Sequence, residues 1–171
     1  ALVGTQKCLS LPADLGIVAV SQRAWEAIAQ KADSEHKYAG YDALLPFRGC
    51  SKNDKPVFPY TMHWNAIEVL ADTLEEHLRE GALTKTLERH QEVATYCRER
   101  LMQMGLELYV REPSCRAATV TAVNVPTFTT WEDFVSATEA RGLFLGGNYG
   151  KLAGKVFRIG HMGRQADQSR W

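Results

Sequence analysis

The sequence has no long hydrophobic run and no excess of charge of either sign. None of its apolar stretches approaches the roughly 20 residues that a transmembrane helix needs. No positively charged segment followed by an apolar one opens the chain. Lysine and arginine together number 20, as do aspartate and glutamate, so the formal net charge is zero. These absences predict a cytoplasmic protein with no membrane or nucleic-acid partner.

Cysteine is scarce, and metal-ligand spacing is missing. The four cysteines lie far apart and form no CxxC pair, which predicts free thiols instead of a disulfide framework or a zinc site. The five histidines show no HExxH or HxxxH pattern, so no metal site is expected. There is also no initiator methionine, because the chain opens inside an apolar strand, ALVG, and stops a few residues into what resembles a helix start. We therefore expect a fragment of a larger protein.

Hydrophobic periodicity divides the chain into two parts. The first part, residues 1–80, is interpreted as the end of a larger α/β domain. Its expected elements are strands at 1–4 and 16–20, the second of them buried, and helices at 22–31 and 61–81. The second part, residues 81–171, is interpreted as a small α+β domain. Its expected elements are helices at 83–105 and 130–141 and strands at 106–110, 118–125, 143–145 and 155–159.

The chemistry is expected to centre on Lys7, which directly follows the first strand in the stretch Gly4-Thr5-Gln6-Lys7. A lysine at a strand end with small neighbours can reach an enclosed aldehyde. Its neutral amine is the reactive form, so burial and nearby positive charges would have to lower its pKa. The alternative is an ordinary solvated loop lysine.

Two further residues carry polar groups in informative places. Arg158 lies inside an apolar strand, between Phe157 and Ile159, where its charge is costly without an anionic partner. That partner is either a carboxylate of the protein or a substrate carboxylate that the planar guanidinium grips at two points. Thr61 stands at an expected helix start, where free N–H groups favour a phosphate. A plain threonine N-cap is the alternative for this residue.

Four segments carry a family resemblance that covers essentially the whole chain: GTQKCLSLPADLGIVAVSQRAWE, YTMHWNAIEVLADTLEEHLREG, RHQEVATYCRERLMQMGLEL and KLAGKVFRIGHMG. Together they resemble the class V aminotransferases that depend on pyridoxal 5′-phosphate (PLP), in the serine–pyruvate, alanine–glyoxylate and serine–glyoxylate group. The resemblance implies the C-terminal part of a fold type I, aspartate-aminotransferase-like enzyme. It also implies a homodimer with its active sites at the subunit interface.

The resemblance implies a role for each candidate residue. Lys7 would form the Schiff base with PLP and then move a proton as general base and acid. Gln6 would contact the cofactor phosphate, Thr61 the phosphate bound in the neighbouring subunit, and Arg158 the substrate α-carboxylate. The substrates would be a small amino acid such as serine or alanine and a 2-oxo acid such as glyoxylate or pyruvate.

The chain departs from the family pattern after the lysine. A Pro-Pro-Gly-like turn is replaced by Pro12-Ala13-Asp14, so Asp14 must fit the turn, as an aspartate can because it visits left-handed conformations more readily than most residues. Phe58 replaces a tyrosine that reaches the phosphate in some relatives. The groups that stack on the cofactor ring and pair with its nitrogen belong to the N-terminal half of such enzymes. We therefore expect this chain alone not to transaminate at a useful rate.

Two other functions stay open on the sequence. A relative that uses pyridoxamine itself as the amino donor would share Lys7 and Arg158. A non-catalytic dimerisation or interaction fragment is suggested by the abrupt ends and by Asp14. Cysteine desulfuration is disfavoured, because no cysteine lies in an evident flexible active-site loop.

Overall fold

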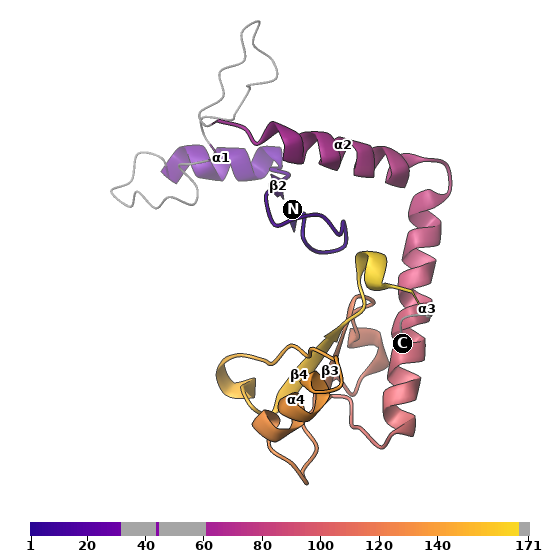
Figure 1. Cartoon of the computed structure of the whole chain (residues 1–171). Coiled ribbons are helices and arrows are strands. Elements are labelled where there is room, and N and C mark those ends of the chain that lie inside the picture. The colour runs from indigo at the N-terminus through magenta and orange to yellow at the C-terminus, as the bar shows by residue number, and fades with distance from the viewer. Residues whose placement is uncertain (32–43, 45–60, 168–171) are drawn as a thin grey trace, which may run out of the picture. The chain divides into compact units, whose positions relative to one another are not determined.

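A computed structural model describes residues 1–31, 44 and 61–167 of the chain (Figure 1). The chain divides into two compact units. The N-terminal unit consists of Ala1–Thr5 and Leu11–Ala71, and the C-terminal unit consists of Gln6–Ser10 and Asp72–Trp171. The short segment that contains Lys7 therefore belongs to the C-terminal unit. The enzyme-domain boundary expected near residue 80 stays a prediction.

A small antiparallel ribbon opens the N-terminal unit. Strand β1 (Leu2–Gly4) pairs with strand β2 (Gly16–Val18), and helix α1 (Gln22–Lys31) follows. The hydroxyl of Ser21 accepts a hydrogen bond from the Ala24 N–H at 3.2 Å and caps the N-terminus of α1. The expectation that the second strand is buried is wrong for this chain, because Val18 is 45% exposed. None of the described residues covers this apolar ribbon enough to bury it.

Two consecutive helices follow the first ribbon in the sequence. Helix α2 spans Trp64–Leu78 and has no buried residue, while helix α3 spans Ala82–Gln103 and buries one face. Both agree with the helical spacing of apolar residues in the sequence. The helix expected at 61–81 is shorter than predicted, since α2 starts at Trp64 and ends at Leu78.

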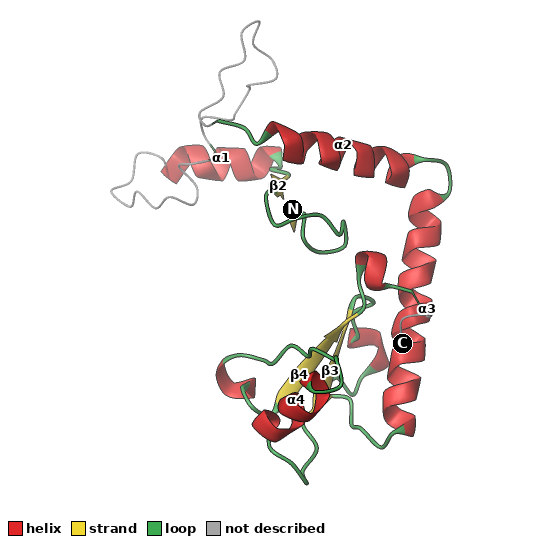
Figure 2. Ribbon diagram, in the orientation of Figure 1, coloured by secondary structure: helices red, strands yellow, loops and turns green. Residues whose placement is uncertain are grey.

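The C-terminal unit combines α3 with a two-stranded sheet and a second helix (Figure 2). Strands β3 (Val120–Asn124) and β4 (Val156–Gly160) pair antiparallel, with Ala122 opposite Arg158. Helix α4 (Trp131–Glu139) lies between them in the sequence. Its N-cap is Thr130, whose hydroxyl accepts from the Asp133 N–H at 3.2 Å. Three single-turn 3₁₀ helices complete the unit: η3 (Pro113–Cys115), η4 (Gly150–Leu152) and η5 (Gly163–Gln165).

The core of this unit lies where the sheet meets the two helices. Helix α3 contributes Cys97 and Leu101, and the sheet contributes Val123, Phe157 and Ile159. The Phe157 ring is 1% exposed and lies 6.2 Å from the Trp131 ring and 5.1 Å from the Phe134 ring, centroid to centroid. This aromatic cluster anchors β4, the strand that carries Arg158.

Two of the expected strands are wrong or reduced. In the segment expected as a strand at 106–110, only Leu108 pairs, opposite Val123. Residues 143–145, expected as a strand, form none, and only the next residue, Gly146, pairs, opposite Arg158. Both segments lie at the edges of the sheet, where each has a partner on one side only, so a few backbone hydrogen bonds are all that define them.

The described residues place limits on other sites. No helix among them is long and apolar enough to cross a membrane. No group of three or more histidine, cysteine or acidic side chains in the same residues could hold a metal ion. Cys8, Cys97 and Cys115 are free thiols, and Cys50 lies outside the described residues.

Candidate functional site

Thr5 organises the base of the loop that carries Lys7. Its side chain is 1% exposed, and its hydroxyl donates to the Pro12 carbonyl at 2.5 Å. Its N–H donates to the Leu15 carbonyl at 3.2 Å, and its own carbonyl accepts from the Leu11 N–H at 3.1 Å. One buried threonine thereby ties the start of the loop to its end. Its role is structural, and the sequence did not single it out.

Lys7 itself is exposed within this chain, as is its neighbour Gln6. The burial expected around the lysine is therefore absent from the described residues. The left-handed residue of the loop also differs from expectation, because it is Ser10, with φ 56°, and not Asp14. The Ser10 N–H donates to the Lys7 carbonyl at 2.9 Å and closes the turn that follows the lysine.

Arg158 has a half-buried side chain with a free donor edge. Its Nε–H donates to the Gly147 carbonyl at 2.9 Å, and its guanidinium carbon lies 5.3 Å from the centre of the Tyr149 ring. Among the described residues no carboxylate forms an ion pair with it, and its two Nη groups have no hydrogen-bond partner. The alternative of a structural arginine–carboxylate bridge therefore finds no support in the described part of the chain. The free Nη groups have the geometry for two-point binding of a carboxylate.

Arg158 also lines a cavity of about 140 Å³ together with Arg98 and Arg116. Arg98 is only 8% exposed, and its guanidinium donates to the Ala117 carbonyl. Burial lowers the pKa of Arg98 from its ordinary value, and the charge of Arg116 lowers it further. Three arginines around one small cavity favour an anion there.

The predicted site residues fall in different units. Gln6, Lys7 and Arg158 belong to the C-terminal unit, whereas Thr61 belongs to the N-terminal unit. Thr61 is exposed and precedes the first residue of α2 by three positions, so it does not occupy the helix start that its expected phosphate contact assumed. Phe58 lies outside the described residues.

His161 is a buried titratable residue next to β4 that the sequence interpretation missed. It is 0% exposed, and its Nε2 shares a hydrogen bond with the Thr121 hydroxyl at 2.8 Å. Burial lowers the pKa of His161, and the positive charge of Arg98 contributes in the same direction. The only hint in the sequence was its place directly after the apolar strand, which many solvated histidines share.

We predict that acid weakens the fold partly through His161. The unfolded chain takes up the proton near the ordinary histidine pKa of about 6.5, while the folded protein resists it. The free energy of unfolding contributed by the neutral ring is therefore complete above about pH 6.5 and is lost as the pH falls below it, at up to about 1.4 kcal/mol per pH unit. Urea unfolding at pH 7, 6 and 5 measures this loss. His161→Gln should flatten the dependence, and His63→Gln, at an exposed histidine, should not. Equal pH slopes in wild type and His161→Gln would contradict the prediction.

Comparison with known proteins adds relatives for nearly the whole chain. No protein-family model matches it. The chain is 34% identical over 169 residues to an uncharacterized aminotransferase of Methanocaldococcus jannaschii, covering 95% of this chain and 41% of that protein. It is 33% identical over 165 residues to the alanine–glyoxylate aminotransferase of Oryctolagus cuniculus, covering 95% and 42%.

A solved structure also matches nearly the whole chain. The pyridoxamine–pyruvate aminotransferase of Mesorhizobium loti matches with a TM-score of 0.84 at 30% identity, over 99% of this chain and 42% of that chain. The chain thus spans about two fifths of the length of the relatives that it matches.

Proposed function

We propose that this chain belongs to the class V aminotransferases, which depend on PLP, and that it forms the part of such an enzyme that carries the cofactor lysine, Lys7. The observation that carries the proposal is homology over 95% of the chain to aminotransferases. The enzyme would transfer an amino group from a small amino acid, of the serine or alanine type, to a 2-oxo acid such as glyoxylate or pyruvate.

Lys7 would hold the cofactor as a Schiff base, and its amine, once released, would accept and return a proton as general base and acid. Lys7 follows β1 by three residues, and its exposure leaves the amine accessible to an aldehyde within this chain, while the enclosure that its reactivity requires would come from the rest of the enzyme. The cofactor, when bound, supplies the electron sink of the reaction. Gln6, adjacent and also exposed, would contact the cofactor phosphate.

Arg158 would bind the α-carboxylate of the substrate. Its free Nη groups, its lack of an ion-pair partner among the described residues and the neighbouring Arg98 and Arg116 support this role. A guanidinium fixed at Nε by Gly147 keeps its orientation while its outer edge meets the carboxylate.

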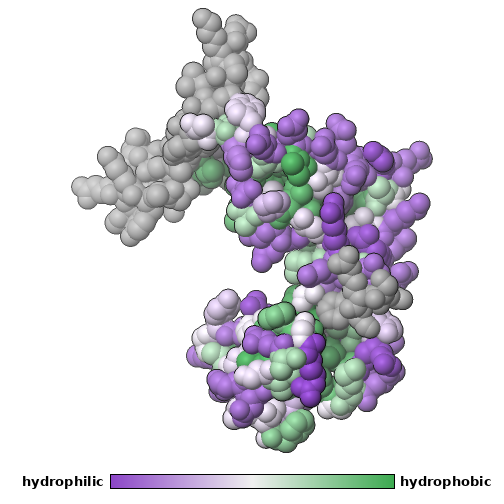
Figure 3. Space-filling view, in the orientation of Figure 1, coloured by the Kyte–Doolittle hydropathy of each residue, from purple (hydrophilic) through white to green (hydrophobic). Residues whose placement is uncertain are grey.

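The complete enzyme would need more than this chain. Enclosure of Lys7 and the groups that act on the cofactor ring would come from the segments that the longer relatives have and this chain lacks. Exposed leucines on α2 support this requirement, since Leu74 is 38% and Leu78 80% exposed. Green side chains interrupt the hydrophilic surface over this helix (Figure 3). A homodimer is part of the proposal, and in it Thr61 would reach the phosphate bound by the other subunit.

The proposal is tested by supplying PLP, L-alanine or L-serine, and glyoxylate, and following the 2-oxo acid that forms from the donor. We expect the 171-residue chain alone to give no useful turnover. We expect the chain within the complete enzyme to be active. Pyridoxamine offered with pyruvate distinguishes the pyridoxamine-dependent variant. Turnover by the chain alone would show that the missing segments are dispensable, and inactivity of the complete enzyme with every pair would contradict the proposed function.

Replacement of Arg158 should weaken use of amino acids. Loss of a hydrogen-bonded, desolvated charge pair costs about 2–5 kcal/mol, so Arg158→Gln should lower kcat/KM by roughly 30- to 4000-fold in the complete enzyme. Arg111→Gln is the control, since Arg111 is an exposed arginine whose ion pair with Glu107 lies on the surface. Amines without a carboxylate should react equally in wild type and Arg158→Gln. Unchanged kcat/KM for alanine in Arg158→Gln would remove Arg158 from the substrate site.

A further inference from the structure

A series of hydrogen bonds links helix α3 to the turn that follows Lys7. His90 on α3 is 5% exposed, and its Nε2 accepts the Gly163 N–H at 2.8 Å. The next residue, Arg164, donates its N–H to the Ser10 hydroxyl at 2.8 Å. The Ser10 N–H in turn donates to the Lys7 carbonyl at 2.9 Å. All of these residues belong to the C-terminal unit.

The partners of the two ring nitrogens determine which nitrogen of His90 carries the proton. Because Nε2 accepts a backbone N–H, that nitrogen must offer its lone pair. The other ring nitrogen, Nδ1, lies 2.6 Å from the Thr86 carbonyl and therefore carries the proton and donates it. Both ring nitrogens of His90 thus serve backbone groups, one within α3 and the other in the turn η5.

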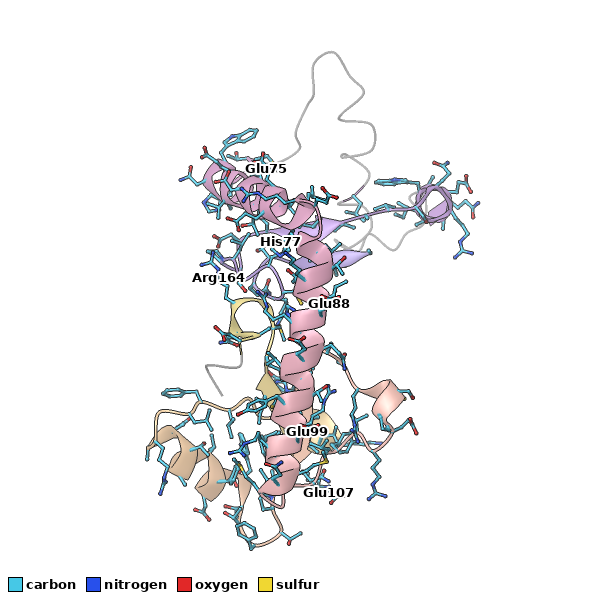
Figure 4. The ribbon with its side chains drawn as sticks, turned by 90° about the vertical axis from the view of Figure 1, so that its right-hand side faces the viewer. Glu75, His77, Glu88, Glu99, Glu107 and Arg164 are labelled. Atoms are coloured by element: carbon cyan, nitrogen blue, oxygen red, sulfur yellow. The ribbon has the colours of Figure 1, made fainter. Side chains whose placement is uncertain are left out.

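Gly163 is held from two sides and leaves no room for a side chain. Its carbonyl accepts from Arg89 Nη2 at 3.3 Å, while its N–H binds His90. Its φ is +60°, and a Cβ there would lie 1.9 Å from the Ser10 hydroxyl oxygen and 3.0 Å from the Cys8 carbonyl oxygen. The η5 turn therefore packs directly against the segment that contains Lys7. Figure 4 shows Arg164 at this turn, beside α3.

Ser10 adopts an unfavourable backbone conformation at this contact. It adopts φ 56°, the left-handed region that non-glycine residues avoid. Its two hydrogen bonds, one to Arg164 and one to Lys7, offset that cost while the η5 turn stays in place. Without the hydrogen bond that the Gly163 N–H donates to His90 Nε2, the η5 turn loses its buried contact with α3.

We propose that His90 is a positioning residue for Lys7. Through Gly163 and Arg164 it holds the Ser10 turn, and the turn sets where the Lys7 backbone lies. The inference rests on the proposed function only where it treats Lys7 as the cofactor lysine. The mechanical link itself concerns His90, Gly163, Arg164 and Ser10, and it can be tested without the cofactor.

Two substitutions of His90 distinguish loss of the His90–Gly163 hydrogen bond from a general loss of folding. In His90→Asn the amide can replace Nδ1 at the Thr86 carbonyl but does not reach Gly163. In His90→Gln the longer amide can place its oxygen where Nε2 accepts the Gly163 N–H. Hydrogen exchange of single amides, followed by NMR on the 171-residue chain, gives the readout. We expect exchange at Ser10 and Arg164 to rise about fivefold to tenfold in His90→Asn. We expect unchanged exchange over residues 93–101 of α3 and recovery in His90→Gln.

Ser10→Ala provides a second variant that leaves α3 untouched. It removes the acceptor of the Arg164 N–H, so exchange at Arg164 should rise as it does in His90→Asn. The proposal is overturned if Ser10 and Arg164 exchange as in wild type when His90 is asparagine. It is equally overturned if exchange rises evenly along α3, or if His90→Gln does not restore the protection.

A second readout tests the consequence for Lys7. The complete enzyme is treated with PLP and reduced, and the label on Lys7 is compared with the label on Lys155, an exposed lysine of the same unit. The ratio should fall at least threefold in His90→Asn and in Ser10→Ala. An unchanged ratio would show that the link does not reach Lys7. Absence of preferential label on Lys7 in the complete wild-type enzyme would count against the proposed function of Lys7 and leave the exchange result standing.

Discussion

Replacement of Lys7 by alanine is expected to abolish covalent attachment of PLP and to lower transamination by about 10²- to 10⁴-fold or more. The amine has two tasks in the proposed function: it bonds to the cofactor aldehyde, and it moves the proton. No neighbouring side chain can take over both, because the adjacent residues are Gln6 and Cys8. The measurement is the rate of 2-oxo acid formation in the complete enzyme, together with the fraction of protein labelled after reduction.

Two further variants define the specificity of that result. Lys7→Arg keeps the positive charge but removes a nucleophilic amine, since the guanidinium stays protonated, so it should be as inactive as Lys7→Ala. Lys155→Ala removes an exposed lysine of the same unit and should leave the rate unchanged. More than a tenth of the wild-type rate in Lys7→Ala would show that another residue holds the cofactor.

Replacement of Gly163 by alanine is expected to have the largest effect on the η5 turn. The left-handed φ of +60° alone costs a non-glycine residue about 1–2 kcal/mol. The Cβ would also lie 1.9 Å from the Ser10 hydroxyl oxygen, and overpacking of this kind costs about 1–3 kcal/mol more. Urea unfolding should therefore show a loss of about 2–5 kcal/mol for Gly163→Ala.

A matched glycine isolates the steric part of this effect. Gly154 has φ +70°, and a Cβ added there would meet no atom within 4 Å, so Gly154→Ala should show the conformational cost alone, about 1–2 kcal/mol. In the double variant with Ser10→Ala the hydroxyl is gone, and part of the Gly163→Ala loss should be recovered. Equal losses for Gly163→Ala and Gly154→Ala would mean that the turn moves away from Ser10 at no cost.

The regular elements could be predicted because their determinants are local. Apolar spacing acts within a few residues along the chain, and the helices expected at 83–105 and 130–141 are confirmed as α3 and α4. The edge segments could not be predicted as well. Leu108 and Gly146 form one bridge each, and how far such a segment pairs depends on its neighbour in the sheet more than on its own residues.

The residues of the candidate site also divide into those with local signals in the sequence and those whose partners are distant. Arg158 could be singled out because a charge in an apolar strand is unusual by itself. His90 and His161 could not, since their partners Gly163 and Thr121 lie 73 and 40 residues away in the sequence. The exposure of Lys7 and of the β1–β2 ribbon also escaped prediction, because the burial of a short segment depends on what packs over it more than on its own residues.

The most direct test of the account is the position at which PLP attaches. The protein is incubated with PLP, reduced with borohydride and digested, and the labelled peptides are identified, with an absorbance spectrum recorded before reduction. The account predicts a band near the visible edge and label concentrated on Lys7, with little on exposed lysines such as Lys85, Lys151 and Lys155. Label spread evenly over those lysines, or no band, would contradict the assignment of Lys7 as the cofactor lysine.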